Sequence, residues 1–129
     1  MDINELPKDQ FAIYGSGPLD VRGIRKARDI DLIVTEKLFK ELSKKYPVKK
    51  STFAKVKIVV DNIEIFKEWQ YNQDVNKLIK EADIINGIRY VQLKDVLDWK
   101  KARALPKDLR DVKLIEEYMK SRKPSDIKP

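Results

Sequence analysis

Three carboxylates and a glycine-rich turn are the residues of this sequence that favour a catalytic site. Gly15-Ser16-Gly17 follows an apolar stretch, Asp29 and Asp31 open the next one, and Glu64 lies within a third. Residues two apart on a strand point to the same face, so Asp29 and Asp31 are expected side by side. If the strand of Glu64 neighbours theirs, three carboxylates converge, and these oxygens are typical ligands of Mg²⁺ or Mn²⁺.

The Gly-Ser-Gly turn supplies the complementary half of such a site. Glycine lets the backbone come close to a ligand, and the N–H groups of a helix opened by Pro18 would point at phosphates. A phosphate cradle beside several carboxylates is what metal-assisted phosphoryl or nucleotidyl transfer needs. Each part alone has an ordinary explanation as a turn or a solvated strand end, so the prediction rests on their combination and order.

Composition narrows the chemistry further. The 129 residues contain no cysteine and no histidine, which excludes thiolate nucleophiles, zinc–thiolate sites and a Ser-His-Asp triad. Lys and Arg number 28 against 21 Asp and Glu, a net charge of +7 that indicates either a polyanionic partner or a lysine-coated surface kept for solubility. Without a signal peptide or a run of about 20 apolar residues, we expect a cytoplasmic protein with no membrane contact.

Periodicity and turn signals predict the strands and helices that carry these residues. Strands are expected over 11–14, 29–34, 52–60 and 63–66, and an Asn-Gly hairpin over 84–91. Helices are expected over 18–23, 36–45 after a Thr35 cap, after an Asp74 cap, over 93–104 and after Pro106. The last helix is expected to bury one face made of Leu109, Val112, Ile115 and Met119.

Early strands followed by closing helices predict the fold class. We expect an α/β (α+β) domain over residues 1–120, with a small mixed β-sheet flanked by helices. Residues 121–129 are charged and hold two prolines, so they are expected to form a tail.

In this order the residues resemble the signature of the nucleotidyltransferase superfamily, the fold shared by DNA polymerase beta and small minimal nucleotidyltransferases. The family pattern is a strand, a Gly-Ser or Gly-Gly turn, a helix, an Asp-x-Asp strand and a third carboxylate on a later strand. Tyr14-Gly15-Ser16-Gly17, Asp29-Ile30-Asp31-Leu32 and Glu64 match it. Glu64 and the third glycine, Gly23, depart from the pattern, because many members carry Asp at the third carboxylate and a different loop.

Two further segments are similar to the abortive-infection toxin type within that superfamily. They are Ile24-Arg25 with the Asp-x-Asp strand, and Lys100-Lys101 with Pro106-Lys107-Asp108 and Asp111. The likeness covers residues 11–66 and, more loosely, 95–115. It implies a toxin–antitoxin component, and the minimal chain leaves room for a partner subunit or a second copy to complete the site.

The resemblance implies transfer of a nucleoside monophosphate from an NTP to RNA, a protein hydroxyl or a small molecule, with two Mg²⁺ ions. Asp29 and Asp31 would hold the metals, and Glu64 would ligate the second metal or act as the base. Ser16 and the backbone of Gly15 and Gly17 would bind the triphosphate. The candidate phosphate contacts are Arg25, Arg28, Lys100, Lys101 and Lys107.

Two other functions stay open at this point. A non-catalytic nucleotide- or RNA-binding module could keep the same residues; its RNA binding would survive loss of Asp29 and Asp31 and weaken steeply with salt. An assembly protein could instead place Trp69, Tyr71 and Trp99 at an interface, unless they belong to the core.

Overall fold

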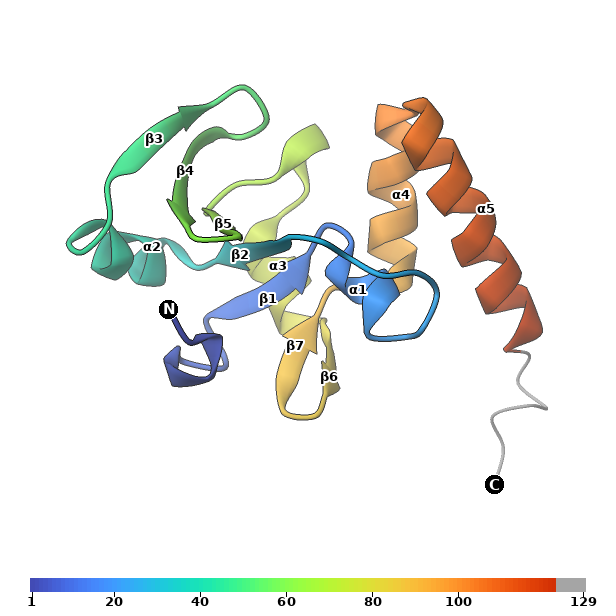
Figure 1. Ribbon diagram of the computed structural model, residues 1–129, viewed down its shortest axis with the longest axis horizontal. Helices are drawn as coiled ribbons and strands as arrows, with labels where there is room; N and C mark the ends of the chain where they lie inside the picture. Colours follow the sequence, from blue (N-terminus) through green and yellow to red (C-terminus); the bar gives the residue numbers. More distant parts are fainter. Residues whose placement is uncertain (123–129) are drawn as a thin grey trace.

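The structure, a computed structural model, describes residues 1–122 (Figure 1). Within them the chain forms a mixed, open sheet of seven strands and five α-helices, which confirms the mixed α/β class. The strand order is β3-β4-β5-β2-β1-β7-β6. The strands are β1 (Phe11–Tyr14), β2 (Ile30–Val34), β3 (Val48–Ser51), β4 (Lys55–Val60), β5 (Ile63–Phe66), β6 (Asp83–Ile85) and β7 (Ile88–Tyr90).

The helices begin where local signals predict. Thr35 Oγ1 accepts a hydrogen bond from Leu38 N at 3.2 Å, and Asp74 Oδ1 accepts one from Lys77 N at 3.3 Å, so both predicted caps are confirmed. The last helix ends at Ser121, and the tail predicted over 121–129 lies, from residue 123 on, outside the described residues. The helices are α1 (Gly17–Asp20), α2 (Glu36–Ser43), α3 (Val75–Lys80), α4 (Leu93–Arg103) and α5 (Pro106–Ser121), with short 3₁₀ turns η1 (Ile3–Glu5) and η2 (Gln70–Asn72).

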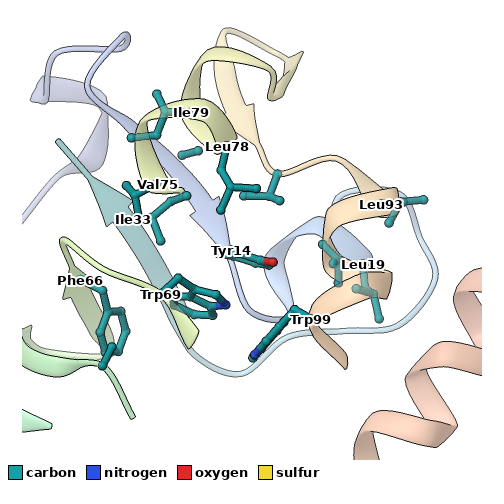
Figure 2. Close-up of a cluster of buried hydrophobic side chains, with 14 of the residues drawn as sticks. Tyr14, Leu19, Ile33, Phe66, Trp69, Val75, Leu78, Ile79, Leu93 and Trp99 are labelled. Atoms are coloured by element: carbon teal, nitrogen blue, oxygen red, sulfur yellow. The ribbon is translucent and has the colours of Figure 1, made fainter. Parts of the chain in front are cut away.

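The two faces of the sheet carry separate cores. One face packs against α2 through a cluster that includes Ile13, Leu32 and Ile65. The other face packs against α3 and α4, and Figure 2 shows its aromatic centre. There Tyr14 stacks on Trp69 with ring centroids 4.3 Å apart and meets the edge of Trp99 at 5.1 Å. Trp69 and Trp99 are therefore core residues, whereas Tyr71 is exposed.

The strand predicted over 52–60 is wrong in its extent. Residues 52–54 form a turn, because Ser51 Oγ accepts hydrogen bonds from Phe53 N and Ala54 N at 3.1 and 3.2 Å, and β4 starts at Lys55. Sequence reasoning also missed β3, the edge strand that precedes this turn. Its residues Val48, Lys49 and Lys50 are all exposed, so the alternation that signals a half-buried strand is lacking.

The buried face of α5 also differs from the prediction. Val112 and Ile115 are buried as expected, but Leu109 and Met119 are 53% and 42% exposed. Asp108 and Asp111 turn inward in their place. Beside the sheet, α4 and α5 lie next to each other as a helical hairpin (Figure 1).

Among residues 1–122, no helix combines the length and the apolar character that a membrane crossing requires.

Candidate active site

A pocket of about 510 Å³ lies between one face of the sheet and the α4–α5 hairpin. Nine of the eleven predicted site residues line it, and they come from the β1–α1 turn, the α1–β2 loop, two strands and both helices of the hairpin. Those nine are Gly15, Ser16, Arg25, Arg28, Asp29, Asp31, Glu64, Lys100 and Lys107. The structure thus brings together in space what the sequence spreads over 93 positions, from residue 15 to residue 107.

The sheet register places two of the carboxylates side by side. Strands β2 and β5 pair in parallel with Asp31 opposite Glu64, so both side chains leave the same face. Asp29 lies just before β2 and is exposed at the pocket rim. Burial, together with the negative charges of Glu64 and Asp29, raises the pKa of Asp31 to about 6.

Because Gly15 has no side chain, the Asp31 carboxylate can occupy the space next to it. A Cβ built on Gly15 would collide with Asp31 Oδ2, and the backbone there is left-handed, with φ of +63°. Gly17 serves a different purpose, because a Cβ on it would collide with Ile13 Cγ2 and it does not line the pocket. Gly15 therefore belongs to the site, and Gly17 allows α1 to pack closely against β1.

Glu64 already has a cationic partner on the neighbouring strand. Lys57 Nζ lies 2.6 Å from Glu64 Oε1, and both side chains are about one-third exposed (29% and 34%). Sequence reasoning missed this pair, which is diagonal: Val59 is the direct partner of Glu64 across the hairpin, and Lys57 lies two residues further along β4. The pair neutralises one of the three predicted carboxylates.

The sheet side of the pocket, called the sheet wall below, carries donor atoms that suit Mg²⁺ but not a complete set of metal ligands. In the described part of the chain, no group of three or more His, Cys, Asp or Glu side chains is arranged to hold a metal ion. Asp31 and Glu64 nevertheless offer the hard oxygen donors that Mg²⁺ prefers. Their mutual repulsion is what a bound cation would relieve, provided that Glu64 turns away from Lys57.

The opposite side of the pocket, called the helical wall below, is formed by the α1–β2 loop, α4 and α5. It is held together by a chain of ion pairs that starts at the β1–α1 turn. Arg25 donates to Ser16 Oγ at 2.8 Å and, through Nε and Nη2, to both oxygens of Asp111 at 2.7 and 2.8 Å. Lys100 Nζ lies 2.9 Å from Asp111 and 3.7 Å from Asp108, and its side chain is only 3% exposed. The ammonium group of Lys100, predicted to contact phosphate, is thus engaged by two aspartates.

The same chain continues to the loop between α4 and α5. Arg103 donates to both oxygens of Asp108 at 2.8 and 2.6 Å, and Leu105 N donates to Asp108 at 3.0 Å, which caps α5. Burial would raise the pKa of both aspartates, but hydrogen bonds from Arg103 to Asp108, and from Arg25 and Lys100 to Asp111, outweigh it and lower both pKa values. These carboxylates are ionised and satisfied.

Two cations at the rim are better placed to meet a ligand. Arg28 and Lys107 are exposed and line the pocket, and within residues 1–122 neither forms an ion pair. Lys101, also predicted as a phosphate contact, points elsewhere and pairs with Glu116 at 3.3 Å.

Sequence reasoning also missed the aromatic end of the pocket. Phe53, Trp99 and Arg103 line it beside Lys107. Phe53 was hidden because its turn was predicted as strand, and Trp99 because it was weighed only as an interface or core residue. One local signal could have pointed to this end of the pocket. It is the pair of opposite charges on Arg103 and Asp108, which lie five positions apart across the α4–α5 loop.

Comparison of this sequence with protein-family models gives no match, and a search of curated proteins gives none either.

Proposed function

We propose that this protein is a Mg²⁺-dependent nucleotidyltransferase with the polymerase-beta-like fold, of the minimal, abortive-infection toxin-like type. It would transfer a nucleoside monophosphate from an NTP to a hydroxyl of RNA, a protein or a small molecule. The pocket with its two unlike walls carries this proposal. Carboxylates gather on the sheet, and cations gather on the loop and helices opposite. A triphosphate that arrives with hard cations needs both kinds of wall.

The residues of the pocket divide into three roles. Asp29, Asp31 and Glu64 would hold the Mg²⁺ ions, which when bound supply charge neutralisation and alignment of the phosphates. Ser16 and the one N–H group of Arg25 that is not already donated to Asp111, Ser16 or Lys26 O would position the phosphates. The exposed side chains of Arg28 and Lys107 would add charge at the rim.

Nucleotide binding tests the proposal first. We expect ATP, GTP, CTP or UTP to raise the Tm only with MgCl₂; a ligand at about 100 times its Kd adds roughly 2.7 kcal/mol. Asp31→Asn removes a partly buried carboxylate charge on the sheet side of the pocket and should abolish the shift. Asp98→Asn, an exposed carboxylate on α4 outside the pocket, should leave it intact. Transfer of α-labelled NMP with release of pyrophosphate then identifies the acceptor.

Two results would contradict this function. One is the absence of a Mg²⁺-dependent shift with all four nucleotides. The other is a shift, or NMP transfer, that survives in Asp31→Asn.

The Lys57–Glu64 ion pair favours a second candidate, a nucleotide- or RNA-binding module without turnover. The pair occupies the third carboxylate at 2.6 Å, so binding could depend on the cationic wall alone. Such a module would bind RNA with a steep dependence on salt, and Asp31→Asn would leave that binding unchanged or strengthen it.

A further inference from the structure

One end of the pocket is aromatic, and only part of it is accessible. Trp99 lines the pocket but is 3% exposed, and its Nε1 donates to Gln70 Oε1 at 2.8 Å, which fixes the ring in the core. Phe53, in the turn between β3 and β4, is half-buried. Phe53 is therefore the aromatic ring that this end of the pocket can offer to a ligand.

The Phe53 ring is held in place before any ligand arrives. It packs against Trp69 and Phe66 with ring centroids 4.7 and 5.4 Å away, and its backbone N–H donates to Ser51 Oγ. Trp69 meets it at 79° and Phe66 at 52°, and a third ring, Trp99, lies 6.2 Å away at 89°, so none of the three stacks on it. A ring already ordered by such contacts loses little conformational entropy when a ligand packs on it.

Arg103 places a flat cation beside this ring. Its guanidinium carbon lies 5.9 Å from the centre of Phe53 and 4.6 Å from that of Trp99, while Asp108 holds it from the other side with two hydrogen bonds. Aromatic rings and arginine planes are the surfaces on which nucleobases stack.

The ion-pair chain joins this aromatic end to the phosphate-binding end. It runs from Ser16 and Arg25 through Asp111, Lys100 and Asp108 to Arg103. Arg25 therefore lies at one end of this chain, and Arg103, beside the Phe53 ring, lies at the other. The carboxylates of Asp31 and Glu64 face this wall from the sheet.

We propose that Phe53 is the stacking surface for the nucleobase of the NTP, which lies along the helical wall with its phosphates toward Arg25. This assignment rests on the proposed function and adds the site of base recognition to it. Stacking on a phenyl ring uses the π-face that every base has, so the pocket would accept purines and pyrimidines alike.

Calorimetric binding of MgATP, MgUTP and magnesium tripolyphosphate separates the base from the phosphates. Phe53→Leu keeps an apolar side chain and removes the aromatic face; we expect both nucleotides to bind roughly 5- to 100-fold more weakly, the range for loss of one base–aromatic stack. Tripolyphosphate should bind as it does to the wild type, and Phe53→Trp should restore nucleotide binding. Phe39→Leu, in the core on the other face of the sheet, should leave all three ligands unaffected.

Each other result overturns the assignment. Equal loss of nucleotide and tripolyphosphate binding in Phe53→Leu would mean general damage to the pocket, and unchanged nucleotide binding would mean that the ring only fills the core. If the wild type binds tripolyphosphate as tightly as ATP, stacking fails while a phosphate site stands. If the wild type binds none of the three ligands, the proposed function fails as well.

Discussion

The pKa values of aspartates on the two walls of the pocket are shifted in opposite directions. On the helical wall, buried Asp111 receives hydrogen bonds from Arg25 and Lys100, and its pKa is lowered despite the burial. On the sheet wall, burial and the nearby charges of Glu64 and Asp29 raise the pKa of Asp31 to about 6. Within residues 1–122 Asp31 forms no ion pair, because the two cations whose charge lowers its pKa, Lys57 and Lys100, are paired with Glu64 and with Asp108 and Asp111.

This difference separates residues that hold the pocket from residues that are free to react. A buried carboxylate with two cationic partners stabilises the wall it belongs to, and losing one partner leaves an unpaired buried charge. A carboxylate pushed toward neutrality by its neighbours stores unfavourable energy that a cation can relieve, as perturbed groups in functional clefts often do. The aspartates of the helical wall therefore hold that wall together, whereas the carboxylates of the sheet wall would gain most from a bound cation.

The largest effect is expected on the helical wall. Asp108→Ala leaves Arg103 and Lys100 without their shared carboxylate and uncaps α5, so the free energy of unfolding should fall by about 3–5 kcal/mol in urea denaturation. Asp98→Ala on the exposed side of α4 is the matched control and should change it by less than about 0.5 kcal/mol. A loss of similar size in both variants would contradict the stabilising role of Asp108 on the helical wall.

Gly15→Ala tests whether the position of Asp31 depends on the missing side chain at residue 15. The left-handed backbone and the collision with Asp31 Oδ2 should together lower the free energy of unfolding by roughly 2–3 kcal/mol. Gly23→Ala shares the positive φ, +73°, but meets no atom within 4 Å, so it should cost only about 1 kcal/mol. Equal losses would show that Asp31 does not depend on the missing side chain.

Asp31→Asn should make the protein more stable at neutral pH. Because the pKa of Asp31 is about 6 when folded and 3.8 when unfolded, folding binds a proton between these values, and the ionised carboxylate destabilises the fold above them. We expect a gain of about 1–2 kcal/mol at pH 7 that shrinks as the pH falls through 6 and vanishes near 4. Melting curves across this range check it, and a variant less stable than the wild type at pH 7 would refute the reading of an unsatisfied charge.

Lys57→Met should have the smallest effect on stability and should leave the carboxylates of the sheet wall without a paired cation. A partly exposed ion pair contributes about 0.2–1 kcal/mol, so the fold should barely change. With Glu64 released and the positive charge near Asp31 removed, Mn²⁺ should bind more tightly, as titration followed by electron paramagnetic resonance would report. Weaker Mn²⁺ binding would mean that Lys57 helps to build the site.

Local signals in the sequence predict most of the elements. Thr35 and Asp74 cap helices, and Asn86 and Gly87 form the hairpin turn, because each acts on its immediate neighbours. Periodicity fails where tertiary contacts override it. In β3 both faces are solvated, and in α5 the ion pairs of Asp108 and Asp111 turn polar positions inward.

The candidate site divides in the same way. The Gly15 turn and Asp31 lie close in sequence and are predicted together, whereas the position of Glu64 depends on β5 pairing with β2, which local patterns left open. The ion-pair chain could not be predicted, because Arg25 and Asp111 are 86 positions apart and only the packing of the hairpin on the sheet brings them together.

That separation has a consequence for the newly made protein. A ribosome adds residues from the N-terminus, so Ser16, Arg25 and the carboxylates Asp31 and Glu64 are translated well before Asp111. Until α5 emerges and docks, Arg25 lacks the Asp111 carboxylate that orients it. The candidate catalytic site is therefore completed late in translation: a nascent chain that stalls before Asp111 carries all the cations that line the pocket but lacks the carboxylate that holds Arg25 and Lys100 in place.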